Sequence, residues 1–454
     1  MYSVIIPIAL LFTLILAKKI PYIGGKVHYA LIISAIVTLI CGGIWNPVEW
    51  ARAWINGLDR LSWVIVLSLV GSFYGVTQAV LGTLDTVVDL FRSLFGKSTR
   101  GMVLAIIVAI AVGGEAFGDC NGAAAVIGVL VIPALAGLGM TGEMIAATIA
   151  LGVMIGSILP PISQAVMLST SILGLPQTVV DETINITFMT AGIIMLFAVL
   201  YAMFFFVREN KPLPAEIIPK DGPLTILRKG FVSLLPLILV VVLIIMNSVF
   251  NLNIMKIILG SVYVFLSRIP VIQGFTNSIV MILIAATLIT LVSKKVRASA
   301  KEIVIEGFQN ILPSISVQAC AAFFVGAILA GGQINVILLA MEGMSEHVVK
   351  VGGGISLALV GMLTGSQTSA QNVIFTFFGP LLMSMDISGS HAAIVGSHLA
   401  SAGQMLPPTN YTGFITASLV SSKLGVDVNP IKVMIYLLPT AFLLAFMGFL
   451  FMYI

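Results

Sequence analysis

Small polar side chains lie beside four breaks in an otherwise apolar sequence. Two breaks are glycine-rich, at 113–122 and 363–369, and two are proline pairs, at 160–161 and 407–408. Neither proline pair can lie inside a continuous helix, because proline lacks the backbone donor and clashes with the preceding turn. At such breaks, unwound carbonyls coordinate small cations, and free N–H groups at helix N-termini attract anions. The breaks therefore predict a binding site for a small anion and a hard cation.

The residues that we predict to form this site are mostly small and polar. Oxygen and amide groups suit a hard ion such as sodium. The candidates for the substrate are Asn121, Gly122, Ser163, Thr368, Ser369, Thr409 and Asn410. The candidates for sodium are Gly118, Asp119, Cys120, Pro160, Gly365, Ser366, Gln367 and Pro407. The alternative is that each serine or threonine only caps a helix.

Asp119 is the most specific of these residues. A carboxylate at mid-membrane costs roughly 2.5–3.5 kcal/mol on insertion scales, so such residues usually face a cavity and have a function there. Asp119 is expected to ligate sodium or to carry a proton. It is equally suited to cap a helix that begins at Asn121, and the two roles are compatible.

The elements that position these residues must be membrane helices. Of the 454 residues, 59% are hydrophobic and 9% are charged, against roughly 45–50% and about 25% in soluble domains. Charge-free runs such as 234–249 and 279–292 approach the ~20 residues that cross ~30 Å of hydrocarbon. The composition excludes an ordinary soluble protein and predicts an all-α polytopic membrane protein.

The hydrophobic runs also predict where the spans lie. Eight spans are expected near 2–17, 28–44, 62–81, 186–207, 231–249, 272–293, 312–332 and 431–453. All four tryptophans lie between Trp45 and Trp63, which predicts an amphipathic helix over 46–60 in the membrane interface. The proline-rich stretch 208–229 is expected to link the two halves of the chain.

Two further regions, 101–174 and 350–422, form an internal repeat with an offset of 247 residues. Twelve of 44 aligned positions are identical between 118–161 and 365–408, and Pro133 precedes Pro160 by the same distance as Pro380 precedes Pro407. Each repeat is expected to be a re-entrant helical hairpin followed by a helix broken at Pro-Pro. Short interrupted segments in corresponding halves are typical of a transporter's binding site.

The distribution of positive charge predicts that the repeats are inverted. Of the 22 Lys and Arg residues, 17 fall in the loops that we place in the cytoplasm and five fall on the other side. Cytoplasmic loops carry the excess of positive charge. Five crossings then separate the two hairpins, and an odd number places them on opposite sides of the membrane.

The predicted domain organisation alternates a scaffold with a transport domain. The segments are 1–100 (scaffold half 1), 101–174 (transport repeat 1), 175–349 (scaffold half 2), 350–422 (transport repeat 2) and 423–454 (C-terminal span). No GxSxG, HExxH or Walker A motif is present, so we expect no enzyme, no catalytic residue and no organic cofactor. The net charge of +4 is spread over the loops, so it says nothing about nucleic acid and bears on orientation instead. We expect the lipid bilayer, and no nucleic acid, as a partner.

The segment 118–161 resembles a known family. Its "IGVLVIPALAGLGM" and "GSILPPI" resemble the large permease subunit (DctM-type) of tripartite ATP-independent periplasmic (TRAP) transporters, in the ion transporter superfamily. The second break, "GQMLPPTNYTG", is similar to that family's second break. The resemblance implies sodium-driven uptake of a small carboxylate, such as a C4-dicarboxylate, in the bacterial inner membrane, by an elevator motion of the transport domain against the scaffold. It also implies a small four-helix membrane subunit and a periplasmic substrate-binding protein as partners.

The two hairpin tips depart from that family in different ways. The first tip is Gly118-Asp-Cys-Asn121, where the family usually has a glycine-serine run. The second tip, 364–370, is also similar to lactate and gluconate permeases, which work without a binding protein. A stand-alone proton- or sodium-coupled organic-anion symporter is therefore the alternative prediction.

Overall fold

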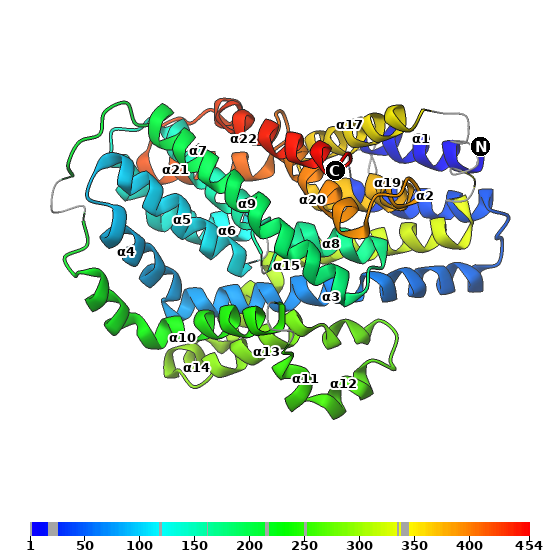
Figure 1. Cartoon of the computed structure of the whole chain (residues 1–454), viewed down its shortest axis with the longest axis horizontal. Coiled ribbons are helices and arrows are strands. Elements are labelled where there is room, and N and C mark those ends of the chain that lie inside the picture. The colour runs from blue at the N-terminus through cyan, green and yellow to red at the C-terminus, as the bar shows by residue number, and fades with distance from the viewer. Residues whose placement is uncertain are drawn as a thin grey trace.

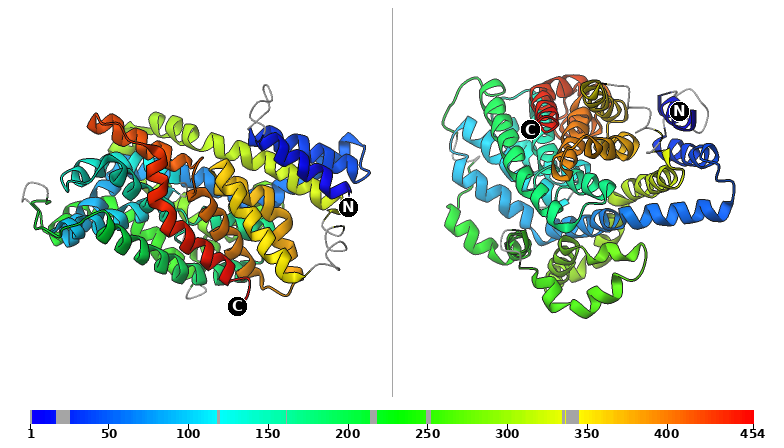
Figure 2. Two further views of the ribbon diagram at one scale, coloured as in Figure 1. Left: turned by 90° about the horizontal axis from the view of Figure 1, so that it is seen from above. Right: turned by 45° about the vertical axis from the view of Figure 1, so that its right-hand side comes forward.

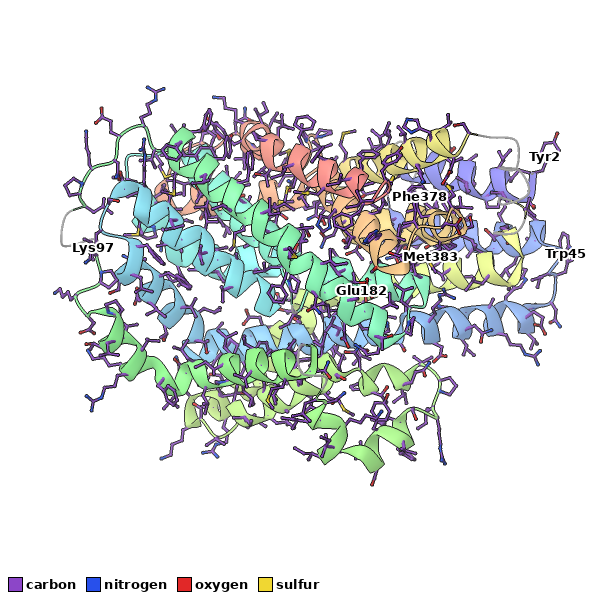
Figure 3. All side chains as sticks on the ribbon, viewed as in Figure 1. Tyr2, Trp45, Lys97, Glu182, Phe378 and Met383 are labelled. Carbon is purple, nitrogen blue, oxygen red and sulfur yellow. The ribbon has the colours of Figure 1, made fainter. Side chains whose placement is uncertain are left out.

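The computed structural model describes residues 2–16, 26–117, 120–160, 162–213, 218–248, 252–333, 336 and 345–454. Over these residues the regular elements are helices (Figure 1), apart from an isolated bridge between Ser98 and Pro212. The prediction of an all-α protein is confirmed for this part of the chain. Lys97 and Trp45 lie near opposite ends of the long axis (Figure 3).

The first helices differ from their predicted form in one respect. They are α1 (Tyr2–Leu16), α2 (Val27–Cys41), α3 (Pro47–Leu81) and α4 (Thr83–Phe95). The predicted interfacial helix 46–60 and the predicted span 62–81 are parts of one 35-residue helix, α3, which begins after the Asn46 cap. No glycine or proline separates them, so the chain bends by 42° between Trp63 and Ile65 without ending the helix.

The first predicted repeat contains four helices. They are α5 (Thr99–Phe117), α6 (Cys120–Ala136), α7 (Gly142–Gly156) and α8 (Gln164–Leu173). The helices α5 and α6 are the two arms of the first hairpin, and α7 and α8 are the two halves of the first broken helix. The arms extend further than expected, because helix replaces most of the predicted glycine-rich tip 113–122.

The middle of the chain is a set of longer and shorter helices. They are α9 (Gln177–Phe205), α10 (Pro223–Ser248), α11 (Ile254–Ile258), α12 (Gly260–Leu266), η1 (Ile272–Thr276), α13 (Ser278–Thr290), α14 (Lys294–Ala298) and α15 (Ala300–Ala330). The predicted span 272–293 is a 3₁₀ turn followed by the 13-residue α13. The helices α10 to α14 lie on the side of α3 that faces away from the hairpins (Figures 1 and 2).

The second predicted repeat and the C-terminus complete the fold. They comprise α17 (Glu346–Thr364), α18 (Gln367–Ala370), the π-helix η2 (Gln371–Phe375), α19 (Thr376–Ser384), α20 (Gly389–Met405), α21 (Tyr411–Leu424) and α22 (Pro430–Leu450). The helices α5, α6, α7 and α8 begin 247 residues before α17, α18, α20 and α21, respectively. The helix starts thus follow the offset that the sequence shows.

Several helices are long and apolar enough to cross a membrane. Four qualify among the described residues: Gln177–Phe205, Pro223–Ile244, Glu346–Thr364 and Pro430–Leu450. The number rises to six if the bent helices α3 and α15 each count as one span. The protein is therefore a multi-pass membrane protein.

The two bent helices cross at close range. A Cβ added to Gly57 of α3 would lie 1.8 Å from the Ala322 carbonyl oxygen, and one added to Gly326 of α15 would lie 1.9 Å from the Ala53 carbonyl oxygen. The backbones touch at both points, so only glycine fits. Small residues spaced by four let membrane helices approach in this way. The crossing buries Ala53 and Gly57 and leaves Trp54 42% exposed.

The second half of each broken helix packs against the helices of the other repeat. The second half of the first broken helix, α8, packs against α20 and α19, whereas the second half of the second, α21, packs against α6 and α7. The four breaks are brought together by this exchange.

Candidate functional site

The tip of the second hairpin lies against the second Pro-Pro break. Gly365 has a left-handed conformation with φ = 65°, and a Cβ there would lie 1.8 Å from the Thr409 carbonyl oxygen. The Thr409 hydroxyl in turn donates to the Met362 carbonyl. Gly365 is therefore needed both for the turn and for the close approach of the break.

Gln404, at the end of α20, links the two hairpins. Its Oε1 accepts from the Gln367 backbone N–H at 2.8 Å, and its Nε2 donates to the Cys120 sulfur at 3.1 Å. Ser401, one turn earlier, donates to Gln367 Oε1 at 2.6 Å. All four side chains are buried. One amide thus joins the first residue of α6 to the first residue of α18.

The first hairpin also contacts the start of α21. Thr412 donates to Asn121 Oδ1 at 3.0 Å, and its hydroxyl lies 3.3 Å from the Cys120 sulfur. Asn410 Oδ1 caps α21 by accepting from the Gly413 N–H at 2.8 Å, while its Nδ2 points to the Met154 sulfur at 3.7 Å. Asn410 therefore connects the second break to the end of α7.

The first Pro-Pro break satisfies its polar groups within itself. Ser157 donates to the Met154 carbonyl at 2.8 Å, and Ser163 donates to the Ser157 carbonyl at 3.2 Å. Ser163 also caps α8 by accepting from the Val166 N–H at 3.2 Å. Only Gln164 reaches out, to the Ser68 hydroxyl of α3 at 3.0 Å.

The capping interpretation therefore holds for several candidates. Ser163, Asn410 and Ser366 each cap the helix that follows, the last by accepting from the Ser369 N–H at 3.2 Å. A cap stabilises a helix by about 1 kcal/mol. Capping uses one lone pair of the oxygen and leaves the hydroxyl or amide group available for a second bond.

The remaining candidates lie at or near the same breaks. Gly118 and Asp119 fall outside the described residues, so their prediction stays untested. Gly122 lies in the first turn of α6. Pro160 and Ser369 are buried, whereas Thr368 and Pro407 are half-buried.

The sequence prediction missed Gln404 and Ser401. Both lie in a run of small residues that reads as ordinary helix. A signal was present in the repeat, because Gln404 precedes Pro407 by three residues, as Ser157 precedes Pro160. The large amide thus occupies the position of a small hydroxyl in the first repeat.

A second buried amide pair lies on the π-helix η2. Gln371 Nε2 donates to the Ala165 carbonyl at 2.6 Å and to Ser169 Oγ at 2.8 Å, so it joins the second hairpin to α8. Asn372 is fully buried, and neither its Oδ1 nor its Nδ2 has a hydrogen-bond partner among the described residues. Buried polar groups are normally bonded, and π-bulges occur frequently at functional sites.

Matching glycines hold each hairpin against its broken helix. A Cβ on Gly114 of α5 would lie 3.3 Å from Val153 Cα, and a Cβ on Gly361 of α17 would lie 2.8 Å from the Ala400 carbonyl oxygen. Both glycines and both contacted residues are 247 positions apart. The second contact is the tighter one.

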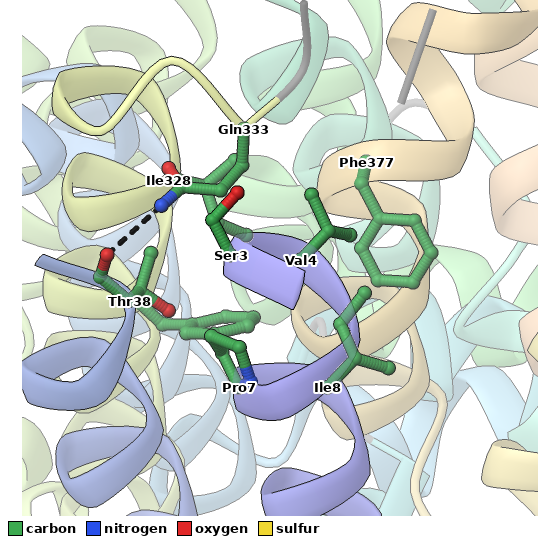
Figure 4. Close-up of a pocket in the computed structure, with 9 residues that line it drawn as sticks. Ser3, Val4, Pro7, Ile8, Thr38, Ile328, Gln333 and Phe377 are labelled. Carbon is green, nitrogen blue, oxygen red and sulfur yellow. Dashed lines mark hydrogen bonds between the residues drawn. The ribbon is translucent and has the colours of Figure 1, made fainter. Parts of the chain in front are cut away.

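Several cavities lined by described residues lie away from the breaks. A space of about 10 Å³ lies among α1, α2, α15 and Phe377, where Gln333 donates to the Thr38 carbonyl at 2.8 Å (Figure 4). That volume is about one water molecule. A larger cavity, of about 460 Å³, lies beside Arg60. No cluster of three or more His, Cys, Asp or Glu side chains suited to a metal ion occurs among the described residues.

Comparison with solved structures places this fold among transporters. The YdaH transporter of Alcanivorax borkumensis superposes with a TM-score of 0.60 and 13% sequence identity, over 88% of this chain and 86% of that chain. The two chains share a fold. At this identity the likeness shows the fold alone. No protein-family model matches the sequence. No curated protein matches it either.

Proposed function

We propose that this protein is a secondary active transporter that couples sodium to the uptake of a small carboxylate. The observation that carries the proposal is the bonding of Gln404 to both hairpins at the second Pro-Pro break. A polar centre built from helix termini inside a transporter fold is the arrangement in which substrates and coupling ions bind.

The two repeats are proposed to be inverted and to form a transport domain that moves as an elevator. The equal offset of four helix starts supports the repeat. The charge asymmetry supports the inversion. A polytopic membrane position follows from the helices; the bacterial inner membrane is part of the proposal.

Sodium is proposed as the coupling ion because the groups at the breaks are neutral oxygens and amides. Asn372 Oδ1 and Gln371 Oε1 are both buried without a hydrogen-bond partner, and a hard cation prefers such oxygens. Asp119 is proposed to add the one negative charge at the first tip. The carboxylate is proposed to bind at the N-termini of α6 and α21, beside Asn121 and Asn410.

The need for partners separates two versions of this function. The tripartite version, with a small four-helix subunit and a periplasmic binding protein, rests on the resemblance of 118–161 to TRAP permeases. The second version, a stand-alone organic-anion symporter, is supported by the likeness to the YdaH transporter, because that likeness spans most of both chains.

Uptake into proteoliposomes tests the proposal. The purified chain is reconstituted with and without the two partner proteins, and uptake of radiolabelled succinate and lactate is measured under an inward sodium gradient. Sodium-driven uptake is expected. Uptake that needs the partners supports the tripartite version, whereas uptake by the chain alone supports the symporter. Uptake that is the same with and without the sodium gradient in both preparations would contradict the proposed sodium coupling.

A further inference from the structure

The 460 Å³ cavity beside Arg60 is separate from the breaks. It is bordered by the first half of α3, the end of α8, the start of α9 and the loop that contains η1. Its size lies within the ~300–1,000 Å³ typical of ligand pockets. Its polar lining includes Ser62, Gln177 and Asn277, and Trp63 lines it as well.

Arg60 is held at the wall of this cavity by one of its donors. Its Nε donates to the Ile172 carbonyl at 2.9 Å, while Ser171 donates to the Arg60 carbonyl at 2.7 Å. Gly174 makes room for the guanidinium group, since a Cβ there would lie 3.0 Å from Arg60 Nη2. The side chain is therefore fixed at the end of α8, with its two terminal nitrogens left for another partner.

No carboxylate of the described residues forms an ion pair with Arg60. The neighbouring Asp59 also lines the cavity, but its Oδ1 accepts from the Val271 N–H at 2.7 Å and so holds the loop before η1. A partly buried charge without a partner is costly. The planar end of an arginine matches a carboxylate, which can accept two parallel bonds from it.

Arg60 also connects this cavity to the second hairpin. It lines a smaller cavity of about 220 Å³ together with Thr376, Pro380 and Met383 of α19. Arg60 thus borders both cavities, and the smaller one is also lined by an arm of the hairpin whose tip contacts Gln404.

We infer that the Arg60 cavity is a second binding site for a small carboxylate, distinct from the site at the breaks. The choice of a carboxylate rests on the proposed function, whereas the site itself rests on Arg60, its missing counter-ion and the cavity. The site holds the anion at the boundary between α3 and the hairpin region before it reaches the breaks.

Trp63 provides a direct test because it lines the cavity. In the full chain, Trp45→Phe, Trp50→Phe and Trp54→Phe leave it as the only tryptophan. Its fluorescence is titrated with potassium succinate, and with potassium chloride, choline chloride and glycerol as comparison solutes. A saturable change with succinate alone is expected. No change with succinate, or the same change with chloride or glycerol, would overturn the inference.

Variants of Arg60 then identify the group that binds. Arg60→Gln is expected to weaken the apparent succinate affinity at least tenfold, and Arg60→Lys, which keeps the charge but loses the planar fork, three- to tenfold. The exposed Arg52→Gln is the matched control and should leave the affinity unchanged. Unchanged affinity in both Arg60 variants would contradict the site.

The two proposals fail independently. Gln404→Ala should lower uptake at least tenfold and leave the Trp63 titration intact, because Gln404 lies at the breaks and not in the cavity. A normal titration in a chain that transports nothing would refute the proposed function alone. Uptake without any titration would refute the Arg60 site alone.

Discussion

The two broken helices share a backbone plan and differ in how far their side chains reach. At the first break, the hydroxyl groups of Ser157 and Ser163 donate to carbonyl groups of the same break, and Ser163 also caps the helix that follows. At the second break, Gln404 and Asn410 bond to both hairpins and to the end of α7. The same backbone motif thus has side-chain hydrogen bonds mainly within itself in the first copy, whereas in the second copy its side chains bond to several other helices.

The largest effect is expected where the two tips differ by a charge. Asp119 stands 247 residues before Ser366, so only the first tip carries a carboxylate. Asp119→Asn keeps a capping oxygen and removes the charge, and it should abolish sodium-driven uptake while the protein stays folded. Ser366→Ala is the matched change and should reduce uptake only several-fold. Undiminished uptake by folded Asp119→Asn would leave this aspartate as a simple cap.

The next effect compares the two residues that precede the proline pairs. Gln404→Ala leaves the Gln367 N–H without its acceptor, and a buried unsatisfied group costs about 1–3 kcal/mol. We expect uptake to fall at least tenfold. Ser157→Ala removes a hydroxyl that bonds only within its own break, so uptake should fall less than threefold. Equal losses of uptake by the two variants in initial-rate assays would show that the second break contributes no more to transport than the first.

The smallest effect concerns the matching glycines. A methyl group at Gly361 would lie 2.8 Å from a backbone oxygen, whereas at Gly114 it would lie 3.3 Å from a Cα atom. Gly361→Ala should therefore cost about 1–3 kcal/mol of stability, as overpacking usually does, and Gly114→Ala less. Thermal unfolding in detergent measures both. A larger drop in Tm for Gly114→Ala would contradict the observed spacing.

Much of the fold could be predicted from the sequence because hydrophobic length and proline placement are local signals. The proline pairs at 160–161 and 407–408 ended helices where expected, and the offset of 247 gave the starts of α7 and α20. The bends of α3 and α15 were not predicted. The bend of α15 lies at Pro313, which interrupts the helical hydrogen bonds. The close crossing of the two helices at Gly57 and Gly326 was not predicted either, because it is a contact between residues far apart in the chain.

The candidate site could be predicted only in part for the same reason. Small polar residues beside a break are visible in sequence, but the partner of each one is not. Gln404 was missed because its importance comes from Gln367 and Cys120, which are distant in the chain. Arg60 was counted only as a loop charge, and its cavity depends on four separate segments.

The most direct measurement tests whether the two hairpins enter from opposite sides of the membrane. Thr141 and Ser388 are exposed, lie 247 residues apart, and cap the first helix after each hairpin. Single cysteines at these positions, in a chain whose Cys41, Cys120 and Cys320 are replaced by serine, are labelled with a membrane-impermeant maleimide in intact cells. The account predicts that Ser388→Cys and Thr141→Cys label from opposite faces, with Thr141→Cys reached only after the membrane is opened. Labelling of both from the same face would contradict it.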